Sequence, residues 1–299
     1  MASDPSTGDT PRGFAFALAA YGMWGFLPLY MKTLAHIPTL EVLAHRVLWS
    51  VPVALAILVW LGRTNDLMRA LRNPRMLGMA AVTALLVSFN WGVYVYAIQS
   101  GQAMEAALGY YINPLFSIFL GRVLLGERLD ALQWGAVALA TLAVAVLTVE
   151  TGRLPVVALA LTLSWGIYAY FKRSLPIGPN QGFALEVILL GPFALAGVVW
   201  LAADGQAMFW NGPLRDDLLL MGCGVVTAVP LMVYANAAKG LRLSTIGIMQ
   251  YIAPTMIFLT AVFLFGEPFG SARAVAFPMI WAALVLYTVA LIRKARAAR

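Results

Sequence analysis

The chain has 299 residues, of which 62% are hydrophobic and 11% are charged, and its formal net charge is +7. Soluble domains carry about 25% charged residues, so this composition excludes a soluble fold and makes lipid the solvent for much of the surface. The positive charge does not indicate nucleic-acid binding, because Lys and Arg fall in short segments between apolar runs. The single cysteine, Cys223, excludes an internal disulfide and a Cys-rich metal site.

Ten apolar segments follow when the sequence is broken at its charged and Gly/Pro-rich points, and each approaches the roughly 20 residues that span a bilayer. The expected helices are residues 13–31, 40–61, 76–98, 103–125, 131–149, 155–173, 181–203, 217–238, 244–265 and 271–292. The first is expected to be a spanning helix rather than a signal peptide, because many others follow it. Residues 1–12 are expected to form a disordered cytoplasmic tail and residues 293–299 a basic cytoplasmic tail.

The distribution of Lys and Arg predicts the orientation. With ten helices, fifteen of these residues fall on the side that holds both termini. Four fall on the other side, namely Lys32, Arg153, Arg215 and Arg273, and Arg46 lies within a helix. We therefore expect both termini to be cytoplasmic.

An internal repeat runs through the chain at an offset of 140 in residue number, or 141 at one motif. Leu108–Leu120 returns as Ile248–Thr260, with Tyr111, Ile112 and Pro114 matching Tyr251, Ile252 and Pro254. Trp24 and Gly25 return as Trp165 and Gly166, at an offset of 141. The chain is thus divided into a first repeat at 13–149 and a second at 155–292, each of five helices. Because five is odd, the second repeat enters the membrane from the opposite side, and the fold is an all-α integral membrane protein with an inverted 5+5 topology.

The order of motifs resembles a known family. The motifs are Ala19–Gly25, Leu43–Ser50, Asn90–Trp91, Glu105–Pro114, Leu125–Arg128, Leu241–Thr245 and Gln250–Pro254. They resemble the RarD branch of the drug/metabolite transporter superfamily, which is built from two EamA repeats. The resemblance implies ten helices around a central cavity lined by helices 1, 3, 4, 6, 8 and 9, and it implies a permease. Related YddG-type proteins resemble exporters of amino acids and aromatic metabolites, but the resemblance leaves the substrate open.

Aromatic and amide side chains share faces of the expected helices at helical spacing. They predict an aromatic-walled substrate cavity in which Asn and Gln bind the polar ends of the substrate and the rings contact apolar groups or an ammonium. The alternative is that these residues only pack helices together. The candidate cavity residues are Trp24, Asn90, Tyr94, Tyr110, Tyr111, Asn113, Trp165, Tyr168, Tyr234, Gln250 and Tyr251.

Pro114 and Pro254 lie inside two equivalent spanning segments, where a proline removes a backbone hydrogen bond and bends the helix. Their matched placement predicts that they are the hinges of two gates. As an alternative, they are static kinks that shape the cavity.

Three ionisable residues lie inside expected spans: Arg46, Glu105 and Glu186. Arg46 and Glu186 are related by the repeat offset, but the inverted topology places them near opposite ends of the bilayer, so we expect no direct bond. Arg46 is expected to extend outward or to bind carbonyl groups of a neighbouring helix.

His45 is expected to pair with Glu41, one turn earlier, and Glu127 and Glu267 are expected to cap the helices that follow them.

The sequence contains no phosphate-binding loop, no His-Glu-x-x-His motif and no Gly-x-Ser-x-Gly motif. We therefore expect no cofactor, no metal and no catalytic residue.

The first hypothesis is a monomeric secondary transporter of the bacterial inner membrane, with a small-molecule substrate and the lipid bilayer as its partners. It would export amphipathic metabolites, amino acids above all, by alternating access. The alternatives are uptake, efflux of drugs or organic cations, and a membrane-embedded enzyme or lipid-handling protein.

Overall fold

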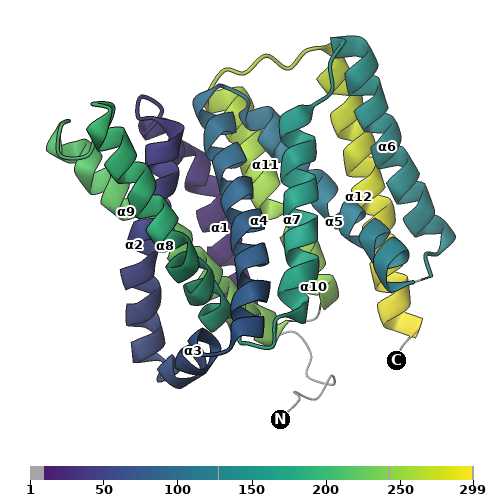
Figure 1. Cartoon of the computed structure of the whole chain (residues 1–299). Helices are drawn as coiled ribbons and strands as arrows, with labels where there is room; N and C mark the ends of the chain where they lie inside the picture. Colours follow the sequence, from purple (N-terminus) through teal and green to yellow (C-terminus); the bar gives the residue numbers. More distant parts are fainter. Residues whose placement is uncertain (1–9, 127, 242, 298–299) are drawn as a thin grey trace.

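A computed structural model of the protein describes residues 10–126, 128–241 and 243–297, which contain helices and no strand. The helices of the first half are α1 (Pro11–Thr33), α2 (Thr39–Trp60), α3 (Thr64–Leu71), α4 (Pro74–Gln99), α5 (Ala103–Leu125) and α6 (Ala131–Thr151). Those of the second half are α7 (Val156–Ser174), α8 (Pro179–Ala203), α9 (Leu214–Gly240), α10 (Leu243–Met249), α11 (Ile252–Leu259), the π-helix η1 (Thr260–Leu264) and α12 (Ser271–Ala297). The long helices pack as one bundle (Figure 1).

Each of the ten expected spans corresponds to helix. Within the described residues, nine segments are long and apolar enough to cross a membrane, and Val156–Lys172 is a shorter apolar helix. The short break after α4 is present. There Gly101 adopts the left-handed conformation (φ 71°), and the Gln99 side chain donates hydrogen bonds to the carbonyls of Leu34 and Ile37. A very short polar stretch is thus enough to separate two spanning helices.

The two expected tails are only partly covered by the described residues. Residues 1–9 of the N-terminal tail lie outside the described residues, and α1 already begins at Pro11. At the other end, α12 continues to Ala297, so residues 293–297 of the basic segment extend the last helix, and residues 298–299 lie outside the described residues.

Two local features were not predicted. A short helix, α3, lies between α2 and α4 with Leu67 and Ala70 buried. The expected helix 244–265 is interrupted at Gln250 and Tyr251 and ends in the π-helix η1. Pro254 has no N–H to donate to the carbonyl of Gln250, so the helix lacks one backbone hydrogen bond at this point. Its equivalent, Pro114, lies inside the continuous helix α5.

The repeat offset is reproduced in the helices. It separates the starts of α2 and α8, of α4 and α9, of α5 and α10, and of α6 and α12. Equivalent helices also have equivalent packing partners. α1 packs on α9 and α11, as α7 packs on α4 and α5, and α2 packs on α8 as α6 packs on α12. In Figure 1, α1 begins at the lower side of the bundle, whereas α7 begins at the upper side.

Glycines allow the equivalent helices to approach closely. A Cβ added at Gly25 of α1 would lie 2.4 Å from Sδ of Met256 on α11, and one added at Gly166 of α7 would lie 2.4 Å from the Phe116 ring on α5. Phe116 and Met256 are themselves related by the repeat offset. The contact of α1 with α11 and that of α7 with α5 therefore use positions that match in the sequence.

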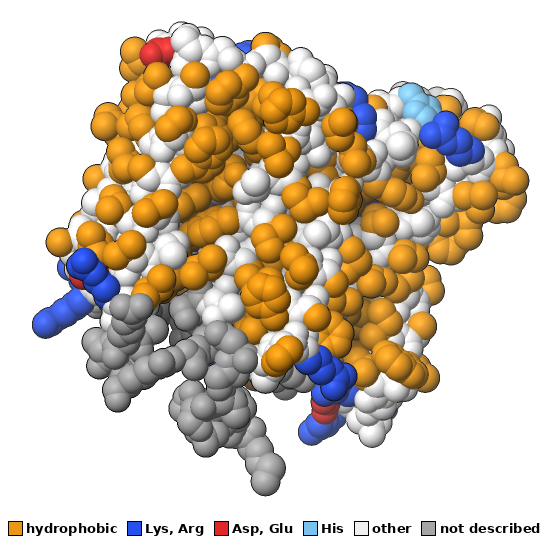
Figure 2. Space-filling model, turned by 180° about the vertical axis from the view of Figure 1, so that it is seen from behind, with side chains coloured by type: hydrophobic (Ala, Val, Ile, Leu, Met, Phe, Trp, Pro, Cys, Tyr) orange, Lys and Arg blue, Asp and Glu red, His pale blue; other side chains and the backbone are white. Residues whose placement is uncertain are grey.

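The outer surface is apolar. Apolar side chains cover the middle of the face seen in Figure 2, and charged side chains lie toward its ends. Large apolar side chains such as Phe193, Phe263 and Val149 are 75–80% exposed, as expected for residues that face lipid.

Candidate functional site: a central cavity between the two halves

A cavity with a volume of about 180 Å³ lies inside the bundle. Its walls come from α1, α2, α4, α5, α7, α9 and α11, so both halves of the chain contribute. Eight of the eleven predicted cavity residues line it: Trp24, Asn90, Tyr94, Tyr110, Asn113, Trp165, Tyr234 and Gln250. Pro254 and Arg46 line it as well.

Three predicted residues lie elsewhere. The hydroxyl of Tyr111 bonds to Oγ1 of Thr255 at 2.7 Å, and its ring meets Phe277 and Trp281. Tyr168 donates its hydroxyl proton to Glu186, and Tyr251 packs against the larger apolar core. These side chains connect helices and do not line the cavity.

Aromatic rings form a cluster at one part of the wall. Tyr21, Trp24 and Tyr234 surround one another with ring centroids 5.6–5.7 Å apart. Tyr94 and Tyr110 form a second pair at 5.9 Å. Such edge and tilted contacts hold the rings in fixed orientations and leave an apolar wall for a ligand.

The polar groups of the wall differ in how fully they are bonded. Nδ2 of Asn90 donates to the carbonyl of Leu161 at 3.1 Å and to Oγ of Ser164 at 2.9 Å, and Oδ1 of Asn90 accepts from Tyr110 at 3.3 Å. Asn90 therefore joins α4 to α7. By contrast, the buried atoms Oδ1 of Asn113, Oη of Tyr94 and Nη1 of Arg46 have no hydrogen-bond partner within the described residues.

The expected outward path of Arg46 is wrong, and in place of the alternative, a bond to carbonyl groups of a neighbouring helix, Arg46 bonds to a hydroxyl of one. Its side chain is buried, its Nε donates to Oγ1 of Thr227 on α9 at 3.1 Å, and its guanidinium lies 5.0 Å from the centre of the Trp91 ring. The prediction considered depth alone, whereas the rotation of α2 about its axis turns Arg46 toward α9 and α4. As predicted, no bond joins Arg46 to Glu186 in the described part of the chain.

Glu186 belongs to a separate cluster. It accepts from Nζ of Lys172 at 2.6 Å and from the hydroxyl of Tyr168 at 3.3 Å, and it is fully buried. Glu105 lies in the first turn of α5, beside a much smaller pocket that Arg153 and Arg273 also line. Neither acid lines the central cavity.

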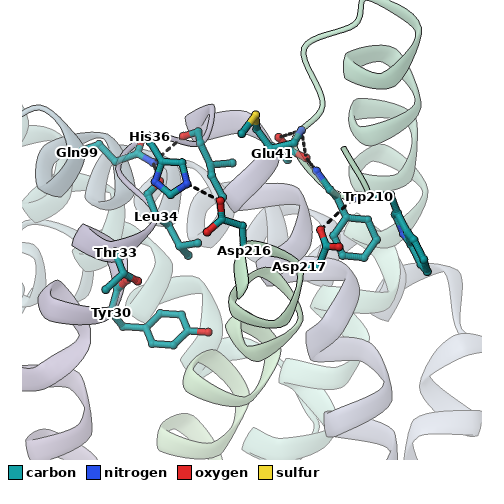
Figure 3. Close-up of polar contacts among 12 residues, drawn as sticks. Tyr30, Thr33, Leu34, His36, Glu41, Gln99, Trp210, Asp216 and Asp217 are labelled. Atoms are coloured by element: carbon teal, nitrogen blue, oxygen red, sulfur yellow. Dashed lines mark hydrogen bonds and ion pairs between the residues drawn. The ribbon is translucent and has the colours of Figure 1, made fainter. Parts of the chain in front are cut away.

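The expected pair of His45 with Glu41 is wrong. Glu41 accepts hydrogen bonds of 2.8–3.0 Å from the backbone N–H groups of Met208 and Phe209, while His45 accepts from Nε1 of Trp49. Figure 3 shows Glu41 in this position, close to the ion pair of His36 with Asp216 at 2.6 Å. Two unpaired N–H groups at a chain turn bind a carboxylate better than one imidazole, because each is a fixed donor.

Glu267 caps a different helix from the one expected. It accepts from the backbone N–H groups of Ala103 and Met104, at 2.6 and 2.9 Å, and so caps α5 of the first half rather than α12. Burial raises the pKa of this carboxyl above its usual value. Glu127, its equivalent, lies outside the described residues.

Some residues of the cavity wall were missed. Tyr21 lies three residues before Trp24, and Thr227 lies seven residues before Tyr234, so helical spacing places each on a predicted face. Trp91 follows Asn90 directly, and no spacing argument would have selected it.

The long apolar helices define a multi-pass membrane protein, and the comparisons with known proteins identify it as a transporter. The EamA-like transporter family matches residues 11–149. An uncharacterized transporter of Vibrio cholerae is 41% identical, over 100% of this chain and 99% of that protein. Protein RarD of Streptomyces exfoliatus is 41% identical, over 96% of this chain and 91% of that protein.

A solved crystal structure at 19% identity has a TM-score of 0.61 over 93% of this chain and 98% of that chain, a likeness of fold alone. The chain belongs to the RarD branch of the drug/metabolite transporter superfamily, among the EamA-like transporters.

Proposed function

We propose that this transporter exports small amphipathic metabolites, most of all amino acids with aromatic or other apolar side chains. The observation that carries the proposal is the cavity of about 180 Å³ between the two halves, whose wall combines aromatic rings with buried polar atoms. Such a wall suits a molecule with one apolar and one polar end. The cargo is moved without chemical change and without a cofactor.

Transport in this proposal proceeds by alternating access in an inverted 5+5 fold with both termini in the cytoplasm of a bacterial cell. The excess of Lys and Arg on one side supports this orientation. Two observations support two equivalent repeats, at 13–149 and 155–292. The starts of the helices match at the repeat offset, and α1 packs on helices of the second half as α7 packs on the equivalent helices of the first. Two equivalent gates on opposite sides of one cavity are the geometry that alternating access needs. The protein acts as a monomer in the inner membrane and binds no nucleic acid.

The prolines are proposed to be the hinges of the two gates. Pro114 and Pro254 are buried, and Pro254 lines the cavity at the interruption between α10 and α11. A second pair, Pro52 and Pro192, is also related by the repeat offset but is exposed on the outside of the bundle. Matched spacing alone therefore does not define a hinge. Burial is what favours Pro114 and Pro254 over the exposed pair, and Pro254 also lines the cavity.

The test is uptake by liposomes that contain the purified protein, with a panel of amino acids and an organic cation, with and without a pH gradient. We expect saturable flux of phenylalanine or another apolar amino acid. Flux of the organic cation alone would favour drug efflux, and the absence of flux for every amino acid would contradict the proposal. Dependence on the pH gradient and on its direction would separate proton-coupled export from uptake.

A further inference from the structure

Arg46 is the one charged residue among the described residues that line the central cavity. Its side chain is 2% exposed and Nη1 has no hydrogen-bond partner. The contacts that it does make, with the hydroxyl of Thr227 and the ring of Trp91, are with neutral groups. A buried guanidinium is strongly disfavoured unless an opposite charge accompanies it.

The acidic residues around the bundle do not supply that charge. The three ion pairs found among the described residues are His36–Asp216, Arg69–Asp66 and Lys172–Glu186, and none includes Arg46. Glu41 and Glu267 bind backbone N–H groups at other points. The repeat offset matches Arg46 with Glu186 of the equivalent helix α8, and that acid has its own counter-ion, Lys172.

Two further polar atoms of the same cavity are unpartnered. Oη of Tyr94 is in a side chain that is 3% exposed, and Oδ1 of Asn113 is in one that is 6% exposed. Native proteins rarely leave buried polar atoms unpaired, and several such atoms around one cavity indicate a ligand that bonds to them. Here a charged donor, a hydroxyl and an amide acceptor face one space of about 180 Å³.

We propose that Arg46 binds the carboxylate of the cargo, so that the transported molecules are amphipathic carboxylates and not cations. The inference rests on the proposed transport function. A guanidinium has a planar set of donors that matches a carboxylate, and the Tyr94 hydroxyl adds a further donor. With a single positive residue in the wall, one carboxylate group supplies the missing counter-charge of Arg46, whereas a phosphate dianion would bring one negative charge more than Arg46 can pair. The Asn113 carbonyl oxygen accepts from a donor on the cargo, such as an amino group.

The test compares three probes with the same apolar group: 3-phenylpropionate, 3-phenylpropanamide and 3-phenylpropylamine. Binding to the full-length protein in lipid nanodiscs is measured by calorimetry and by fluorescence of the cavity tryptophans. We expect the carboxylate to bind about tenfold more tightly than the amide, which corresponds to about 1.4 kcal/mol, and the amine to bind more weakly than the amide. Equal or tighter binding of the amine, or no measurable binding of the carboxylate, would overturn the proposal.

Substitutions at position 46 test whether Arg46 causes the preference for the carboxylate over the amide. Arg46→Gln should bind the amide as the wild type does but lose the tenfold preference for the carboxylate. Arg46→Lys should keep part of it, because a point charge replaces the planar donors. Arg153→Gln, which removes an exposed positive charge outside the spanning segments, is the control and should change nothing. A preference that survives in Arg46→Gln contradicts the proposal.

Measuring both binding of the probes and liposome flux distinguishes a failure of the Arg46 assignment from a failure of the transport proposal. If Arg46-dependent binding of the carboxylate occurs but liposomes show no flux, the assignment of Arg46 holds and the transport proposal fails. If the amide and the amine are carried as well as the carboxylate, transport holds and the assignment fails.

Discussion

Tyr111 of α5 and Thr255 of α11 share a hydrogen bond of 2.7 Å between the two helices that contain the matched prolines. Thr255 uses its own hydroxyl proton to bond the carbonyl of Tyr251. Tyr111 is therefore the donor in the bond to Thr255. The equivalent pair, Tyr251 and Leu115, cannot form such a bond, so this connection between the halves has no symmetric copy.

This bond should contribute measurably to stability. In a double-mutant cycle of Tyr111→Phe and Thr255→Val, we expect a coupling free energy of about 0.6 kcal/mol, the average for interhelical hydrogen bonds in membranes. Unfolding in mixed micelles measures it. Additive effects of the two substitutions would show that the bond contributes nothing.

The hinge proposal predicts a difference between two pairs of prolines. Substituting Ala for both Pro114 and Pro254 restores a backbone donor in each helix and stiffens it. Liposome flux should then fall, about tenfold if the barrier rises by about 1.4 kcal/mol, while substrate still binds. The control replaces Pro52 and Pro192, which share the repeat offset but are exposed. Equal loss of flux in both double variants, or undiminished flux in the first, would remove the hinge assignment.

Gly224 allows α9 to contact α2. A Cβ there would lie 2.2 Å from the backbone carbonyl of Trp49, which cannot move aside as a side chain can. Gly224→Ala should therefore destabilise the protein by about 1–3 kcal/mol. Gly191→Ala is the matched control, because a Cβ at this helical glycine meets nothing within 4 Å and should stabilise by about 0.5–1 kcal/mol. Thermal unfolding in detergent compares them, and similar melting temperatures would contradict the predicted contact.

The buried pair of Lys172 and Glu186 is expected to be structural. Removing one partner, as in Lys172→Met, should cost about 3–5 kcal/mol because it leaves an unpaired buried charge. Replacing both, with Lys172→Met and Glu186→Leu together, should recover most of that loss. Flux in the double variant should respond to a pH gradient as in the wild type, and a lost response would instead give Glu186 a role in proton coupling.

Periodicity and composition were sufficient to predict the helices, because lipid requires long apolar segments and polar breaks between them. The repeat offset also predicted which helices are equivalent. The partners of the polar side chains were harder to predict. His45 was assigned to Glu41 one turn earlier and Glu267 to the helix that follows it, whereas the His45 ring lies against Phe209 and Glu267 caps α5. Arg46 was expected at the membrane surface or on carbonyl groups of a neighbouring helix, and it bonds instead to the Thr227 hydroxyl of α9.

These errors have one physical cause. Sequence spacing gives the face of a helix but not the angle at which that face meets its neighbours. The interruption at Gln250 and Tyr251 was missed for a related reason, since the equivalent proline at position 114 leaves α5 continuous. Among the predicted cavity residues, Tyr111 and Tyr251 were misplaced because they share the proline motif with residues that do line the cavity.

The central claim is that the cargo passes through the cavity between the two halves. Counterflow of labelled L-phenylalanine in proteoliposomes tests it, with wild type compared with Ala253→Trp, which fills the cavity, and Ala145→Trp, which adds the same ring at an exposed position of α6. The account predicts saturable flux in the wild type and in Ala145→Trp and its loss in Ala253→Trp. Flux that persists in Ala253→Trp, or its absence in the wild type, would contradict the account.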